Sequence, residues 1–126
     1  MNAHHKPLKI GLIGTGFMGK THVYGYAIAD RVFDLPYKLE LVSVADVSED
    51  LAQSAAHSLG FKRATSNWLD LIDDRDLDLI SITSPNEFHK EMAIAALEAG
   101  KHVYCEKPLA PTLKDCDEMV CVAGKS

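Results

Sequence analysis

Residues 8–19 read LKIGLIGTGFMG, an apolar run that ends at the spaced glycines Gly14, Gly16 and Gly19. The run Leu8–Ile13 predicts a buried strand, because it is short and almost entirely apolar. The next segment, Lys20–Asp30, carries apolar residues at helical spacing and predicts a helix. A strand, a glycine-rich turn and a helix in this order are typical of the first unit of a parallel α/β sheet.

The three glycines match the pattern G-x-G-x-x-G, which is typical of dinucleotide-binding folds. In that pattern Gly14 permits a tight turn, Gly16 lets the backbone approach a pyrophosphate, and Gly19 lets the helix pack closely on the strand. The phosphates would bind free N–H groups at the helix N-terminus, and Phe17 and Met18 lie between the glycines of this loop. We therefore expect these five residues to bind a dinucleotide.

The same loop also fits a second pattern, G-x-x-x-x-G-K-[ST], which is typical of nucleoside-triphosphate-binding loops. In that interpretation Lys20 would bind the β- and γ-phosphates and Thr21 would bind Mg²⁺. The dinucleotide interpretation is favoured because Gly16 has no required role in the second pattern. An acidic residue downstream favours it as well.

That residue is Asp46, which follows the apolar segment Leu39–Ala45, the second predicted strand. A carboxylate at this point accepts hydrogen bonds from the ribose hydroxyls of the adenosine. Asp46 lies 27 residues after Gly19 (46 − 19), and a predicted loop at Arg31–Lys38 accounts for the excess over the usual spacing of about 20. Residues 47–50 include no Lys or Arg for a 2′-phosphate, which the carboxylate would repel. NAD is therefore favoured over NADP.

The rest of the chain alternates between short apolar runs and longer segments of helical period. Ser48 is expected to cap the helix Glu49–Leu59, and Gly60 to end it. The other expected elements are strands at Phe61–Thr65, Leu77–Thr83 and His102–Cys105 and helices at Trp68–Ile72, Glu87–Ala99 and Thr112–Val122. This order predicts an α/β fold of the Rossmann type, a doubly wound parallel sheet with strand order 3-2-1-4-5. Residues 1–126 are expected to form one NAD(P)-binding domain, with residues 1–7 as a flexible lead-in.

Composition narrows the classes of partner. The chain has 126 residues, a net charge of −5 and 47% hydrophobic residues, which is typical of a soluble globular domain. The acidic balance argues against a nucleic-acid partner, and no apolar run approaches the roughly 20 residues that cross a membrane. The three cysteines, Cys105, Cys116 and Cys121, show neither metal-ligand nor paired spacing. We expect no metal site, and reduced thiols in a cytoplasmic protein.

The second half of the chain closely resembles the Gfo/Idh/MocA family of oxidoreductases. The resemblance rests on SPNEFH at residues 84–89 and AALEAGKHVYCEKPLA at residues 95–110, and it continues back through the glycine loop to Lys9. It implies an enzyme that transfers hydride from a CH–OH group of a sugar or polyol to NAD. It also implies that the full-length enzyme forms oligomers.

The resemblance implies roles for the residues of these motifs. Ser84, Pro85, Asn86 and His89 would line the nicotinamide-ribose side of the cleft. Glu106 and Lys107 would lie beside them after the fifth strand, with Pro108 making the turn rigid, often through a cis peptide in this family. The Lys107 ammonium would then stabilise the alkoxide that develops as hydride leaves, which makes it the expected catalytic residue.

Each of these residues also has an ordinary structural interpretation. Lys107 would then be a solvated surface residue, and His89 a residue that caps or packs the start of a helix. His22, which lies in the first predicted helix, is expected to be a packing residue rather than a residue that binds a ligand.

Family members normally continue into a second α/β domain that supplies substrate contacts, and that domain is absent from this sequence. We therefore expect the chain to bind NAD(H) without full catalysis. The alternative hypothesis is a free-standing module that senses NAD or interacts with another protein, without dehydrogenase activity.

Overall fold

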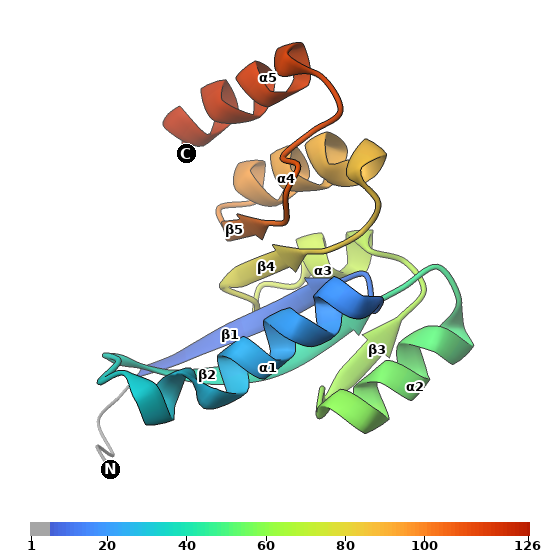
Figure 1. The fold of residues 1–126 in the computed structure, drawn as a ribbon, viewed down its shortest axis with the longest axis vertical. Helices are drawn as coiled ribbons and strands as arrows, with labels where there is room; N and C mark the ends of the chain where they lie inside the picture. The colour runs from blue at the N-terminus through green and yellow to red at the C-terminus, as the bar shows by residue number, and fades with distance from the viewer. Residues whose placement is uncertain (1–5) are drawn as a thin grey trace.

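The computed structural model describes residues 6–126, in which strands and helices alternate along the chain (Figure 1). The elements are β1 (Lys6–Ile13), α1 (Phe17–Val32), β2 (Tyr37–Ala45), α2 (Glu49–Leu59), β3 (Arg63–Thr65), α3 (Leu69–Asp73), β4 (Leu79–Ile82), a 3₁₀ turn η1 (Asn86–Phe88), α4 (His89–Glu98), β5 (His102–Cys105) and α5 (Leu113–Gly124).

The strands form one five-stranded sheet in the order β3-β2-β1-β4-β5, and every pair is parallel. This confirms the predicted Rossmann-type topology. The chain moves outward from β1 to β3 and then crosses back to β4, so the direction of winding reverses between β1 and β4. Open α/β sheets bind ligands in the crevice beside such a reversal.

Helices cover both faces of the sheet, as the doubly wound prediction requires, and each face has its own apolar core. On one face α1 and α2 enclose the smaller core, built from Leu12, Val23, Val44, Ala55, Ala56 and Phe61. On the other face α3, α4 and α5 enclose a larger core that includes Leu71, Ile80, Ile82, Met92 and Met119. In Figure 1 α1 and α2 lie in front of the strands, and α5 packs on α4 at one end of the molecule.

Two segments that were expected to be irregular are partly helix or strand. Lys6 and Pro7 belong to β1 rather than to a lead-in, because they continue the parallel ladder opposite Tyr37 and Lys38. Residues 1–5 of the expected lead-in lie outside the described part of the chain. The expected loop at 31–38 shrinks to residues 33–36, because α1 runs on to Val32 and β2 already begins at Tyr37. The residues by which the distance from Gly19 to Asp46 exceeds the usual spacing therefore belong to a longer helix and a longer strand.

Helix ends agree better with the sequence where a side chain caps them. Ser48 caps α2 by accepting a hydrogen bond from the Leu51 N–H at 3.1 Å, and Gly60 ends it in the left-handed conformation. In contrast, α1 begins at Phe17, three residues before the expected start, with Gly16 as its N-cap. Between residues 6 and 126, none of the helices is both long enough and apolar enough to span a bilayer.

Candidate functional site

The register of the sheet brings four strand ends into one row. Ala45 of β2 lies opposite Ile13 of β1, Ile13 lies opposite Ile82 of β4, and Ile82 lies opposite Cys105 of β5. The loops that follow these four residues therefore leave the sheet side by side. All the residues that the sequence predicts for the site lie in or just after these loops.

The glycine loop packs directly on the end of β4. Gly14 has a φ of +97°, and a Cβ at this residue would lie 2.8 Å from the Ser84 nitrogen. A Cβ at Gly19 would lie 2.3 Å from the Gly14 carbonyl oxygen, and the Thr83 hydroxyl donates to that same oxygen at 2.7 Å. Gly14 and Gly19 are therefore required by the packing of the loop itself.

Gly16 differs from its two neighbours in the motif. A Cβ at Gly16 would meet no protein atom within 4 Å, so packing within the chain does not require glycine here. Gly16 is the N-cap of α1, and the Lys20 N–H is the first helical amide that bonds a carbonyl one turn back, that of Gly16 at 3.1 Å. The amides of Phe17 and Met18 precede that first bond and remain available to an anion.

Asp46 lies against this loop. One oxygen of its carboxylate accepts hydrogen bonds from the Thr15 hydroxyl and from the Thr15 N–H, the latter at 3.0 Å. The other oxygen accepts from the Val47 N–H at 2.6 Å. The carboxylate is half-buried and fixed beside the glycine loop, and an ionised carboxylate has lone pairs left for further donors.

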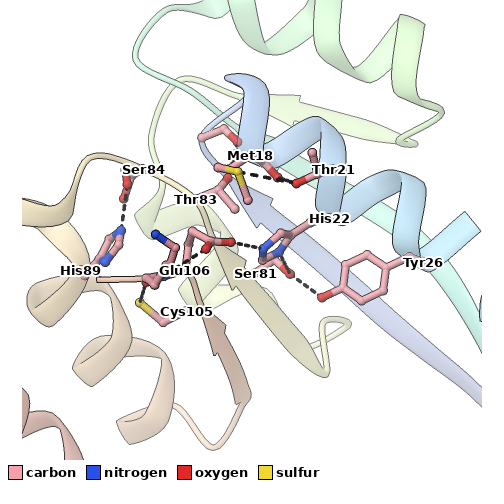
Figure 2. A network of polar contacts seen from close by, with 12 residues as sticks. Met18, Thr21, His22, Tyr26, Ser81, Thr83, Ser84, His89, Cys105 and Glu106 are labelled. Carbon is pink, nitrogen blue, oxygen red and sulfur yellow. Dashed lines mark hydrogen bonds and ion pairs between the residues drawn. The ribbon is translucent and has the colours of Figure 1, made fainter. Parts of the chain in front are cut away.

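The segment after β4 divides into exposed and buried parts. Pro85 and Asn86 are exposed, whereas His89, the first residue of α4, has only 1% of its surface exposed. The His89 Nε2 lies 2.8 Å from the Ser84 carbonyl oxygen (Figure 2). The His89 Nδ1 lies 3.0 Å from the Pro108 carbonyl oxygen. His89 thus joins the loop after β4 to the loop after β5 without presenting its ring to solvent.

The loop Glu106–Pro108, called here the lysine loop, is held on its other side by α1. The Glu106 carboxylate contacts the His22 Nε2 at 2.8 Å and accepts the Lys107 N–H at 3.0 Å. These two contacts hold the pKa of the Glu106 carboxyl below its usual value, the His22 contact having the larger effect. The Lys107 side chain is exposed, and the Lys107–Pro108 peptide is cis, as the resemblance implies.

The sequence did not reveal three of the residues that build the site. His22 was expected only to pack, yet it contacts Glu106, which lies 84 residues further along the chain. Thr15 fixes Asp46, and Thr83 bonds the carbonyls of both Ile13 and Gly14. The only signal in the sequence was the position of Thr15 and Thr83 beside strand ends and of His22 in the first helix, which does not name a partner.

A comparison with known protein families decides between the two interpretations of the loop. The Gfo/Idh/MocA family, described as an oxidoreductase family with an NAD-binding Rossmann fold, matches residues 8–126. The chain belongs to this family. Its glycine loop is therefore the dinucleotide type rather than the triphosphate type.

Individual relatives give the same result. A levoglucosan dehydrogenase from Pseudarthrobacter phenanthrenivorans is 46% identical over 113 residues, which cover 89% of this chain and 29% of that protein. An inositol 2-dehydrogenase from Salmonella typhimurium is 37% identical over 114 residues, covering 90% of this chain and 32% of that protein. Among solved structures, levoglucosan dehydrogenase in complex with NADH and L-sorbose has a TM-score of 0.94 at 42% identity. That match covers 96% of this chain and 33% of the other. The chain thus spans about a third of the length of the relatives it matches.

Proposed function

We propose that this chain is the NAD-binding part of an oxidoreductase that removes hydride from a CH–OH group of a sugar or polyol. The observation that carries the proposal is the row of four strand ends, which brings together the glycine loop, Asp46 and the lysine loop. Relatives named as levoglucosan and inositol dehydrogenases support the same class of substrate.

The residues present fit a dinucleotide. A Cβ at Gly16 would project into open space, so glycine leaves room there for a pyrophosphate, and the amides of Phe17 and Met18 are suited to bind it. Asp46 would accept hydrogen bonds from the adenosine ribose. When bound, NAD supplies the hydride acceptor.

NAD is proposed in preference to NADP for an electrostatic reason. Both oxygens of Asp46 are held in place by neighbouring donors, so the carboxylate is not free to turn away from a 2′-phosphate. The helix that follows begins with Glu49 and Asp50, which add further negative charge. A phosphate carrying about two negative charges would be repelled at this point.

Roles at the other end of the row of strand ends follow from exposure. Ser84, Pro85 and Asn86 would contact the nicotinamide ribose. Lys107 is exposed at the end of the row, and its ammonium would stabilise the alkoxide that develops on the substrate. Glu106 would position the lysine loop through the Lys107 amide. Because the His89 ring is buried between two loops, we assign it a positioning role rather than a contact with the cofactor.

The remaining parts of the proposal concern the whole protein. The substrate contacts are assigned to the longer proteins of which this chain matches about a third. The oligomeric state expected from the family is assigned to them as well. We expect this chain alone to bind NADH without oxidising inositol or hexoses.

Its three cysteines are unpaired, which supports a reducing compartment such as the cytoplasm.

Titration of the chain with NADH, followed by the enhancement of NADH fluorescence, tests the proposal. Asp46→Ala should weaken NADH binding roughly ten- to a hundred-fold, because a charged acceptor of hydrogen bonds is lost. The same substitution should reduce the preference for NADH over NADPH. Asp30→Ala is the matched control, since it removes the same charge from an exposed residue near the C-terminal end of α1. Unchanged selectivity in Asp46→Ala would contradict the role of this carboxylate. Binding of Mg²⁺-ATP without binding of NADH would contradict the proposed function itself.

A further inference from the structure

A series of polar side-chain contacts runs from α1 through the sheet to the lysine loop, and apart from Glu106 the proposed function gives its residues no role. It links the side chains of Tyr26, Ser81, His22 and Glu106 in that order (Figure 2). His22 and Tyr26 lie one turn apart on α1, Ser81 lies in β4, and Glu106 directly follows β5. Three elements distant in sequence therefore meet at one histidine ring.

The burial of the residues in this series of contacts shows that they are not ordinary surface pairs. Ser81 has 0% of its surface exposed and His22 has 8%. The His22 ring also packs on the ring of Tyr104 in β5, with 4.6 Å between the ring centroids. Within residues 6–126 no buried side-chain nitrogen or oxygen lacks a hydrogen-bond partner. Buried polar groups that are all satisfied hold one arrangement of side chains in place.

The direction of each hydrogen bond follows from the chemistry of the groups. An ionised carboxylate only accepts, so the proton of the His22 ring lies on Nε2, which faces Glu106 at 2.8 Å. In a neutral ring Nδ1 then accepts, and its partner at 3.3 Å is the Ser81 hydroxyl. The Ser81 oxygen in turn accepts from the Tyr26 hydroxyl. Burial raises the pKa of the Tyr26 hydroxyl, so this hydroxyl stays protonated and donates the first hydrogen bond of the series.

We propose that His22 is a positioning residue for the lysine loop, and that Ser81 and Tyr26 fix the tautomer in which its Nε2–H holds the Glu106 carboxylate. The second oxygen of that carboxylate accepts the Lys107 N–H at 3.0 Å, so the contact continues into the backbone of the lysine. His22 lies on the helix whose first turn carries the dinucleotide loop. The ring therefore ties the phosphate-binding end of α1 to the residue to which the proposed function assigns catalysis.

Two ionisable groups besides Glu106 face the ring, namely Tyr26 from its own helix and Tyr104 from β5. Neither is a carboxylate or a cation, so Glu106 is the charged partner among the described residues that contact the ring. The effect of removing His22 should therefore appear at Glu106 and at the Lys107 amide.

Nuclear magnetic resonance on the ligand-free chain tests this inference by three measurements. These are the protonated nitrogen of His22, the pKa of the Glu106 carboxyl, and the hydrogen exchange of the Lys107 amide. We expect the proton on Nε2. In His22→Leu the Glu106 pKa should rise towards its ordinary value, and Lys107 exchange should become roughly ten-fold faster or more, because a hydrogen bond to a charged group is lost.

His22→Gln is the rescue variant, because its amide N–H can reach the place of the His22 Nε2–H. It should keep the Glu106 pKa low and the Lys107 amide protected. Ser81→Ala removes the donor to Nδ1 and should weaken the preference for the Nε2–H tautomer. His57→Leu, on the exposed side of α2, should leave all three measurements unchanged. If His22→Leu does not fold, the Gln and Ala variants still give the decision.

The inference is overturned if the proton lies on Nδ1, if His22→Leu leaves Glu106 and Lys107 unchanged, or if His22→Gln behaves like His22→Leu. All these measurements are made without NADH, so their outcome is separate from that of the proposed function. In a chain that binds NADH, His22→Leu should also weaken binding several-fold while His22→Gln stays close to the original chain. Equal binding by both variants would show that the lysine loop does not depend on His22.

Discussion

Replacing Gly16 and Gly19 by alanine, one at a time, should separate the binding of the cofactor from the stability of the fold. At Gly19 the added Cβ would lie 2.3 Å from the Gly14 carbonyl oxygen, closer than the 3.0 Å that real Cβ atoms respect. At Gly16 it would meet no protein atom within 4 Å. The two substitutions add the same methyl group three residues apart, so their difference reports only what surrounds each site.

The free energy of unfolding should respond very differently. Overpacking costs typically about 1–3 kcal/mol, and the upper end applies to Gly19 because the opposing atom is backbone that the Thr83 hydroxyl holds. Alanine recovers about 0.5–1 kcal/mol through a less flexible unfolded chain, which leaves a net loss of about 2 kcal/mol. That loss corresponds to a fall of roughly 8 °C in Tm for a domain of this size. For Gly16 the loss of a glycine N-cap and the same gain nearly cancel.

Thermal unfolding followed by circular dichroism and titration with NADH together check this prediction. Gly16→Ala should unfold within a few degrees of the original chain yet bind NADH at least ten-fold more weakly, because its methyl group occupies the approach to the pyrophosphate. Gly19→Ala should be clearly less stable. The reasoning is refuted if Gly16→Ala binds NADH normally, or if Gly19→Ala matches the original chain in Tm.

Three further predictions concern other parts of the chain. Burial raises the pKa of the Cys105 thiol to about 11, whereas Cys121 is exposed. Iodoacetamide at pH 8 should therefore label Cys121 before Cys105, which peptide mass spectrometry would show. Equal labelling rates would contradict the burial of Cys105. Ser48→Ala should cost about 1 kcal/mol in urea unfolding because α2 loses its cap, and an unchanged midpoint would contradict that role. Because His22 and the Lys107 amide lower the Glu106 pKa in the folded chain, the stability that this carboxylate contributes is complete above the ordinary value of about 4.3. It is lost as the pH falls through the folded value, so urea unfolding between pH 3 and pH 7 should show a weaker dependence in Glu106→Gln than in the original chain.

Much of the fold was predictable because its signals are local. An apolar run, a glycine cluster and a helical period each depend on neighbours within a few residues, and so does the cap that Ser48 provides. Element ends were less predictable, as the longer α1 and β2 show. The end of a helix depends on what it packs against, and the sequence does not state that.

For the site as well, the sequence predicted some features and only the tertiary structure decided others. The sequence by itself determined which residues follow the strands, among them Gly14, Asp46 and Lys107, because strand ends in a parallel sheet share one edge. Only the tertiary structure decided that His22 bonds Glu106 and that His89 turns inward between two loops. Such contacts join residues up to 84 positions apart, and their partners are set by the register of the sheet and the seating of its helices. Sequence therefore determined the chemical groups of the site, and the fold decided which of them face a ligand and which hold the others in place.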